Sequence, residues 1–181
     1  MEPGDYSLTE TLVAQYYPYI VRLAHSILQD AAEAEDVAQE TFITALVHIE
    51  TCDSDANFKA WLSTIAVNKC RDLLRKRKTR QKFTDAWQAV RLLGQSPTPE
   101  EITEQSDAQT ALWQAVNSLN DKHRLPILLR YVHNLSIHEI ARVLDVKEGT
   151  IHSRLHNACQ KLAGQLDVNL DTVPLANRSY P

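Results

Sequence analysis

The chain has 181 residues, a length that suits one large or two small domains, and it is rich in alanine and leucine but holds only 4 glycines, a composition that favours an all-α fold. Its three cysteines, Cys52, Cys70 and Cys159, are far apart, which argues against a disulfide framework and is typical of a reducing compartment. No stretch approaches the roughly 20 apolar residues of a membrane span, and the first residues lack the basic and apolar parts of a signal peptide. We therefore expect a cytoplasmic protein without membrane insertion.

The formal net charge of −4 hides a strong segregation of charge along the chain. Residues 1–60 hold eleven acids and two bases, whereas residues 61–82 hold eight bases and one acid. Residues 83–120 are acidic again, and residues 121–164 hold seven bases against four acids. A separate basic block can bind phosphate while an acidic face meets a basic partner.

Apolar residues at intervals of three or four predict a helix over residues 8–28 and a second over about 32–48. Pro18 lies inside the first run and predicts a kink or a new helix start at that point. A polar loop over residues 51–57 follows the second helix. The apolar positions of the second helix are Val37, Phe42, Ala45, Leu46 and Ile49.

The second helix also carries two acids on one side. Asp36 and Glu40 are four residues apart, so both carboxylates point the same way, with Gln39 beside them. Like charges at this spacing cost a few tenths of a kcal/mol in an isolated helix, and a cationic partner would reverse that penalty. A solvated acidic face without a partner is the alternative.

A third helix is predicted from Phe58 through Leu74, and the basic run from Arg75 to Lys82 forms its end. Cations at a helix C-terminus complement the macrodipole by roughly 0.3–1 kcal/mol each, which accounts for some of them. Such a density of cations normally serves phosphate contact. Asp72, four residues before Lys76, is expected to form an ion pair within the helix.

Residues 83–109 are predicted to be an acidic linker, because a glycine and two prolines interrupt the chain there, although residues 83–93 have a helical pattern. The boundary between two domains, 8–82 and 110–166, belongs in this segment. Residues 167–181 form a polar tail that we expect to be poorly ordered.

The second domain begins with a helix from about residue 110, and Asn120 or Asp121 is predicted to cap the next. Pro126 indicates that this helix starts nearer Arg124 or bends. Asn134 is a suitable left-handed residue at the end of the helix.

Residues 136–162 have the pattern of two short helices joined by a tight turn at Asp145 and Val146. Ser136 and Glu139 have capping-box spacing at the start of the first helix. In the second, an inward stripe of Ile151, Leu155, Ala158 and Leu162 leaves an outer face with donors, acceptors and cations, which suits a helix in a DNA major groove. The outward residues are His152, Ser153, Arg154, His156, Asn157, Gln160 and Lys161. An ordinary helical hairpin with a solvated face is the alternative.

A zinc site is a third interpretation, because His152, His156 and Cys159 share one helical face. A fourth ligand is not evident, so we expect no metal and no cofactor. The sequence contains no glycine-rich phosphate loop, nucleophile elbow or Ser-His-Asp order, so we do not expect an enzyme.

Three stretches, in this order and at this spacing, resemble the extracytoplasmic-function (ECF) sigma factors of the sigma-70 family, which direct bacterial RNA polymerase to promoters. They are AEAEDVAQETFITAL at 32–46, FKAWLSTIAVNKCRDLLRKRK at 58–78 and SLNDKHRLPILLRYVHNLSIHEIARVLDVKEGTIHSRLHNACQKL at 118–162. The resemblance implies two small helical domains joined by a linker, the C-terminal one a helix-turn-helix, and promoter-specific initiation with recognition of −10 and −35 elements and help in melting DNA. A stand-alone helix-turn-helix regulator that does not dock on polymerase is the alternative, but it leaves the acids at Asp36 and Glu40 unexplained.

The resemblance also implies partners and a role for each matched residue. The docking helix, which grips the clamp coiled coil of the largest polymerase subunit, would use Asp36, Gln39, Glu40 and Phe42. Contacts around the −10 element would come from the loop residues Asp53, Ser54, Asp55 and Asn57, which receive a flipped base, and from Trp61, Asn68, Arg71, Arg75, Lys76, Arg77 and Lys78. Contacts at the −35 element would come from Lys147, Thr150, His152, Ser153, Arg154, His156 and Lys161. The flap of the second-largest subunit and an anti-sigma factor are the further partners expected.

The chain departs from the family pattern at a few of these positions. Val67 stands where members often carry arginine, and His152 stands where they often carry lysine. We infer weaker phosphate anchoring by this recognition helix and more dependence on base contacts or on the polymerase.

Overall fold

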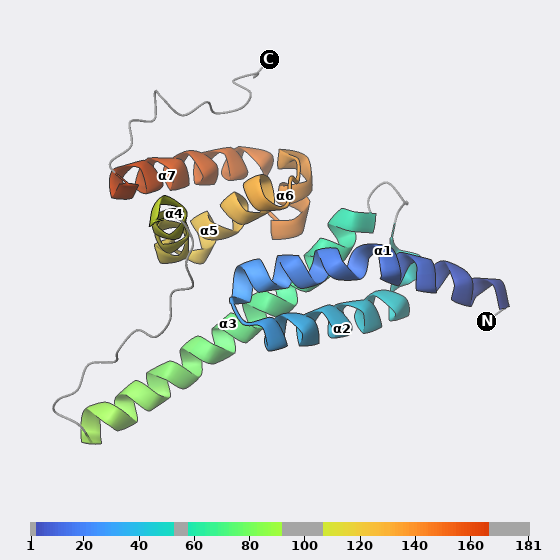
Figure 1. Ribbon diagram of the computed structural model, residues 1–181, viewed down its shortest axis with the longest axis horizontal. Coiled ribbons are helices and arrows are strands. Elements are labelled where there is room, and N and C mark those ends of the chain that lie inside the picture. Colours follow the sequence, from blue (N-terminus) through green and yellow to red (C-terminus); the bar gives the residue numbers. More distant parts are fainter. Residues whose placement is uncertain (1–2, 53–57, 92–106, 167–181) are drawn as a thin grey trace, which may run out of the picture. The chain divides into compact units, whose positions relative to one another are not determined.

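The computed structural model describes residues 3–52, 58–91 and 107–166, and these form helices, turns and short connections without any strand (Figure 1). The prediction of an all-α fold is confirmed. The chain divides into two units, one of residues 1–99 with 138–145 and the other of residues 100–137 with 146–181. The predicted loop residues 53–57, most of the predicted linker and the predicted tail lie outside the described residues.

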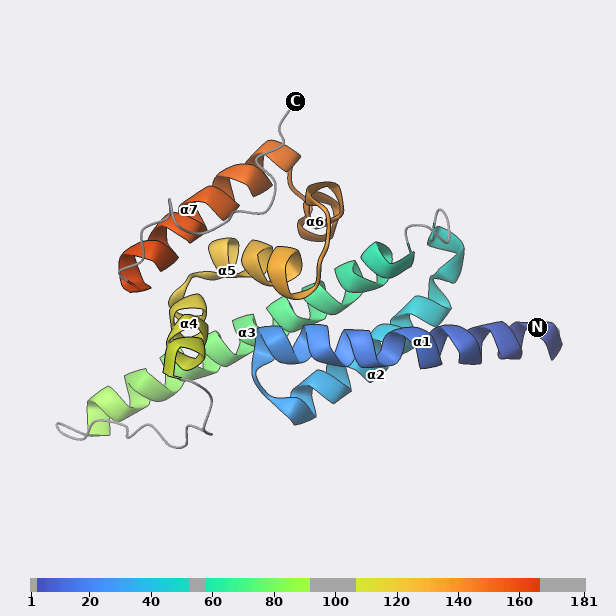
Figure 2. The same cartoon turned by 45° about the horizontal axis from the view of Figure 1, so that its top comes forward.

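The first unit is built on three helices, α1 (Pro3–Leu28), α2 (Ala31–Val47) and α3 (Phe58–Arg91), with a 3-10 turn, η1 (Ile49–Thr51), after α2. Each of the three helices packs against the other two (Figure 2). On α1 the buried residues recur at the spacing of one helix face, and they meet buried residues of α2 and α3. The fully buried side chains of this core include Ile20, Leu23, Ile27, Val37, Leu62 and Val67.

The corner between α1 and α2 is sharp and well defined. Helix α1 ends at Leu28 because Gln29 adopts a left-handed conformation, with φ of 56°. Asp30 then caps α2, and its Oδ1 accepts a hydrogen bond of 2.9 Å from the backbone N–H of Glu33. The direction of α2 relative to α1 is thereby set by a connection of only two residues, Gln29 and Asp30.

Pro18 does not start a new helix, because α1 runs through it without a break. A proline removes the hydrogen bond to the carbonyl four residues earlier, here that of Ala14. Pro18 and Ala14 are both exposed, so this carbonyl can bind water instead. The exposed position explains why the helix tolerates a residue that normally interrupts it.

Helix α3 is longer than the sequence indicates. It continues to Arg91, so the prediction that the basic run Arg75–Lys82 ends the helix is wrong. Residues 83–91, the first part of the predicted linker, are helical. The macrodipole acts only within the last turn of a helix, and therefore it does not explain the cations at residues 75–78.

The remaining helices are α4 (Asp107–Ser118), α5 (Asp121–Ile127), the π-helical turn η3 (Leu128–Val132), α6 (Ile137–Leu144) and α7 (Glu148–Leu166). In the second unit α5 packs against both α4 and α7, and α4 also contacts α7. Ile151 and Ala158 of α7 are fully buried, and Leu155 is nearly so, which confirms the predicted inward stripe at these three positions.

The predicted pair of short helices at 136–162 is confirmed as α6 and α7. The turn between them includes Asp145 in a left-handed conformation, with φ of 51°, and Asn134 before α6 has φ of 54°, as predicted. Helix α5 begins at Asp121, so the later start suggested by Pro126 is wrong. The helical path instead changes to the wider π-turn directly after Ile127, where His133 N–H donates to the Leu128 carbonyl at 3.1 Å.

Candidate protein- and nucleic-acid-binding surfaces

The acidic face of α2 is open to solvent. Asp36, Gln39 and Glu40 are all exposed. The carboxylate of Glu40 pairs with the ammonium group of Lys69 from α3 at 3.2 Å, and the Glu40 side chain stays 67% exposed. No cation among the described residues pairs with Asp36. This face therefore retains carboxylates that a basic partner can reach.

Phe42 lies on the buried side of α2. It is 7% exposed, and its ring centroid is 5.9 Å from that of Tyr17 on α1. Phe42 therefore belongs to the core, and any part it takes in docking passes through the position of α2. The sequence pattern had already listed Phe42 among the apolar positions of this helix, and only the family resemblance grouped it with the docking residues.

The surface of α3 carries polar and basic side chains along several turns. Asn68, Arg71, Lys76 and Lys78 are exposed, whereas Val67 is fully buried. Trp61 is half-buried, with its ring 5.7 Å from that of Phe58, so it combines core packing with a partly accessible edge.

Two of the predicted DNA-binding cations, Arg75 and Arg77, are already paired with acids of the protein itself. Arg75 forms an ion pair with Asp72, its neighbour three residues earlier. The predicted ion pair within the helix is thus present, but its partner is Arg75 rather than Lys76.

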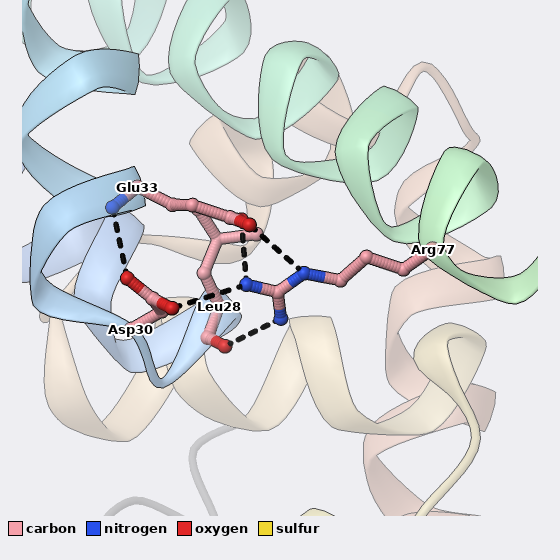
Figure 3. A network of polar contacts seen from close by, with 4 residues as sticks. All are labelled: Leu28, Asp30, Glu33 and Arg77. Atoms are coloured by element: carbon pink, nitrogen blue, oxygen red, sulfur yellow. Dashed lines mark hydrogen bonds and ion pairs between the residues drawn. The ribbon is translucent and has the colours of Figure 1, made fainter. Parts of the chain in front are cut away.

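Arg77 is the centre of a polar network that joins α3 to the corner between α1 and α2 (Figure 3). Its guanidinium group pairs with Glu33 at 2.6 Å and with Asp30 at 3.6 Å, and it donates to the carbonyl oxygen of Leu28 at 3.2 Å. These bonds occupy the fork of the guanidinium group. The structure therefore gives Arg77 a role in holding the three helices together, a role the sequence did not indicate.

The outer face of α7 presents most of the predicted −35 residues. Lys147, Ser153, His156 and Lys161 are exposed, and Thr150, His152 and Arg154 are half-buried. The hydroxyl of Ser153 donates to the carbonyl oxygen of Gly149 at 3.0 Å, which leaves its acceptor lone pairs free to point outward.

Lys161 has a neighbour that the sequence analysis missed. Its Nζ lies 3.4 Å from Nδ1 of His123, a buried residue of α5. Burial lowers the pKa of His123, and the nearby cations Lys161, Lys122 and Arg154 lower it further. The ring is therefore neutral near pH 7 and can accept a hydrogen bond from the Lys161 ammonium group. No local pattern links two residues so far apart in sequence.

The zinc interpretation finds no support in the structure. Among the described residues no group of three or more histidine, cysteine, aspartate or glutamate side chains is arranged to hold a metal ion. Burial raises the pKa of the Cys159 thiol, and it raises that of the Cys70 thiol to about 12.

No helix among the described residues combines the length and the apolar composition needed to cross a bilayer. In the part of the chain that the structure describes, the fold and the surfaces define a helical protein with an exposed acidic helix face, a long basic helix and a helix-turn-helix.

Comparisons with known proteins agree with this class. A family model described as Sigma-70 region 2 matches residues 12–80, and one described as Sigma-70, region 4 matches residues 109–162. The ECF RNA polymerase sigma factor SigW of Bacillus subtilis is 32% identical over 174 residues, covering 92% of each chain. SigL of Mycobacterium tuberculosis, another ECF sigma factor, is 32% identical over 160 residues, covering 88% of this chain and 89% of SigL.

Solved structures lead to the same family. The sigma factor RpoE from Bartonella quintana, in complex with the anti-sigma factor NepR, has a TM-score of 0.68 and 25% identity, covering 88% of this chain and 97% of that one. CnrH, in complex with the cytosolic domain of CnrY, has a TM-score of 0.65 and 25% identity, covering 91% and 90%. The chain belongs to the ECF sigma factors, the initiation factors that give RNA polymerase its promoter specificity.

Proposed function

We propose that this sigma factor docks on core RNA polymerase through the exposed acidic face of α2 and contacts promoter DNA through α3 and α7. The observation that carries the proposal is the opposite charge of two exposed surfaces in one unit. Helix α2 contains no lysine or arginine, whereas α3 exposes Arg71, Lys76 and Lys78. The acidic face suits a basic partner, and the basic helix suits phosphate.

On the DNA side, α3 serves the −10 element. In this proposal Asn68 and the accessible edge of Trp61 contact the separated strands, and Arg71, Lys76 and Lys78 bind phosphate. Arg75 and Arg77 contribute less, because both are paired with acids of the protein itself. The residues proposed to receive a flipped base, Asp53, Ser54, Asp55 and Asn57, are outside the described residues and remain part of the proposal.

Helix α7 serves the −35 element. Its exposed or half-buried residues offer the mixture of donors and acceptors that reads base edges in a major groove. Arg154 and His156 would contact bases, and Lys147 would contact phosphate. Lys161 is held near His123, so we assign it to the flank of the interface.

The protein supplies binding energy, and the polymerase supplies the chemistry. We propose the clamp coiled coil of the largest subunit as the partner of α2 and the flap of the second-largest subunit as a partner of the second unit. We also propose an anti-sigma factor, because the similar sigma factor RpoE of Bartonella quintana forms a complex with the anti-sigma factor NepR.

Capture of purified core polymerase by the immobilised full chain tests the docking assignment. Asp36→Arg and Glu40→Arg each place a cation on the acidic face, and we expect each to weaken capture about tenfold, equal to about 1.4 kcal/mol. Asp72→Arg makes the same charge change on an exposed acid of α3, outside α2, and should leave capture unchanged. If neither α2 variant weakens capture, the docking assignment is wrong.

A further inference from the structure

Lys69 of α3 joins two surfaces to which the proposed function assigns different partners. Its ammonium group donates to Oε2 of Glu40 on α2 at 3.2 Å, and α2 packs directly against α3 (Figure 1). Glu40 belongs to the proposed polymerase-docking face, whereas Asn68, the residue before Lys69, belongs to the proposed DNA-binding surface. A single ion pair therefore connects the two proposed surfaces.

The position of Lys69 along α3 places it in line with a proposed phosphate contact. Lys76 follows it by seven residues, which is almost two helical turns. Both side chains therefore leave α3 on nearly the same side, about 10 Å apart along the axis. Lys76 is exposed, whereas the side chain of Lys69 is 25% exposed and reaches Glu40. Because a lysine has a flexible stem of four carbons, Lys69 can turn toward the phosphates near Lys76 once Glu40 binds another cation.

The carboxylate of Glu40 is accessible to such a cation. Its side chain is 67% exposed, so a basic partner can reach it from solvent. A cation that approaches Glu40 also approaches the ammonium group of Lys69, and the two like charges repel each other. Departure of Lys69 relieves this repulsion. An ion pair exposed to solvent contributes little stability, so its loss costs little free energy.

We propose that Lys69 competes with the polymerase for Glu40, and that docking releases Lys69 to bind a promoter phosphate near the −10 element. The inference rests on the proposed docking function and adds a coupling between docking and DNA binding. In the free chain, the ion pair neutralises one acid of the docking face and one cation of α3. In the complex with polymerase and DNA, each of the two charges meets a partner of its own. The coupling is reciprocal, because DNA that binds Lys69 also frees Glu40 for the polymerase.

Equilibrium binding of the fluorescently labelled full chain to purified core polymerase tests the competition. Lys69→Met keeps the apolar stem and removes the charge. It should bind the polymerase about threefold more tightly, because an exposed ion pair no longer has to be broken. In a Glu40→Gln background the same substitution should gain less, because no carboxylate remains for Lys69 to occupy. An equal gain in both backgrounds would overturn the inference, since Lys69 would then act only by repelling the cations of the polymerase.

Promoter binding by polymerase saturated with each variant, measured over a range of salt concentrations, tests the release. Lys69→Met should reduce the salt slope by roughly 0.9, the value for one lost phosphate contact. Lys76→Met should reduce the slope by a similar amount without tightening the binding of polymerase, because Glu40 pairs with Lys69 and not with Lys76. An unchanged slope for Lys69→Met would show that Lys69 does not reach DNA, and it would also overturn the inference.

Further outcomes separate this inference from the docking proposal. If Glu40→Arg weakens the binding of polymerase while Lys69→Met leaves it unchanged or weakens it, the docking proposal stands and the competition is wrong. If Asp36→Arg and Glu40→Arg both leave binding unchanged, the docking proposal is wrong and this inference falls with it. Lys69→Arg keeps the charge and should behave like the wild type in both assays. If Lys69→Arg instead behaves like Lys69→Met, the charge is not responsible, and the inference is overturned.

Discussion

Replacement of Arg77 by methionine should destabilise the protein rather than weaken its hold on DNA. Methionine keeps an apolar stem of similar length and removes only the guanidinium group. That group pairs with Glu33 and Asp30 and donates to the Leu28 carbonyl. Its loss removes the polar contacts between α3 and the corner of α1 and α2, while the apolar packing of α3 remains.

The expected size of the effect follows from the geometry. Hydrogen bonds to charged groups contribute about 1.5–3 kcal/mol each. Solvent reduces this value here, because the side chains of Arg77, Asp30 and Glu33 are 40%, 44% and 34% exposed. One oxygen of Glu33, Oε2, is nevertheless buried and has Arg77 beside it at 2.6 Å, and without that cation it would be left without a partner. We expect a loss of about 1–3 kcal/mol in the free energy of unfolding.

Urea denaturation followed by circular dichroism measures this loss. Lys76→Met is the matched control, because Lys76 is the adjacent residue and is exposed; its unfolding should change by less than about 0.5 kcal/mol. A double-mutant cycle with Glu33→Gln should show that the two substitutions are not additive. The reasoning is refuted if Arg77→Met unfolds like Lys76→Met and also lowers the salt slope of promoter binding, since Arg77 would then be a phosphate contact.

Three further predictions concern the surfaces of α3 and α7 and the contact inside the second unit. Lys76→Ala together with Lys78→Ala should weaken promoter binding by polymerase across all sequences and reduce the salt slope by roughly 0.9 per lost phosphate contact; an unchanged slope would remove both lysines from the DNA interface. Arg154→Ala should change the preference at one −35 position by about 1–3 kcal/mol, whereas a uniform loss over all −35 variants would make Arg154 a phosphate contact. His123 has a lowered pKa in the folded state, so the unfolded chain takes up more protons, and the wild type should lose stability as the pH falls through the ordinary histidine value of 6.5. The melting temperature of His123→Gln should therefore fall less between about pH 7.5 and pH 5.5 than that of the wild type. An equal fall in both proteins would contradict the assignment of a buried, neutral ring to His123.

Sequence periodicity accounts for most of the helical architecture. The pairs of helices at 8–48 and 136–162 could be predicted because burial of one face requires apolar residues at intervals of three or four. The left-handed residue at Asn134 could be predicted because asparagine tolerates that conformation better than most residues. The end of α3 could not be predicted in this way. Residues 83–91 have only a weak helical pattern, and the acids and prolines that follow them indicate a linker.

For the candidate surfaces, the sequence identified charge but not its partners. Arg77 belongs to the same basic run as Lys76 and Lys78, yet only the packing of α3 on the α1–α2 corner shows that it binds acids of the protein itself. The predicted apolar positions Leu46 and Ile49 are 45% and 39% exposed rather than buried. Composition does not distinguish a core residue from an interface residue, because both are apolar.

The sequence by itself determined the local properties of this protein: where helices form, where acids and bases gather, and which family pattern the three stretches follow. These depend on residues within one or two helical turns of each other, which the periodicity of the chain exposes directly. Only the tertiary structure decided which side chains remain available to a partner. Whether a charged side chain is available depends on contacts such as those of Arg77 with Glu33 and of Lys161 with His123. These contacts join residues about forty positions apart, so they depend on how the helices pack and not on their order in the sequence.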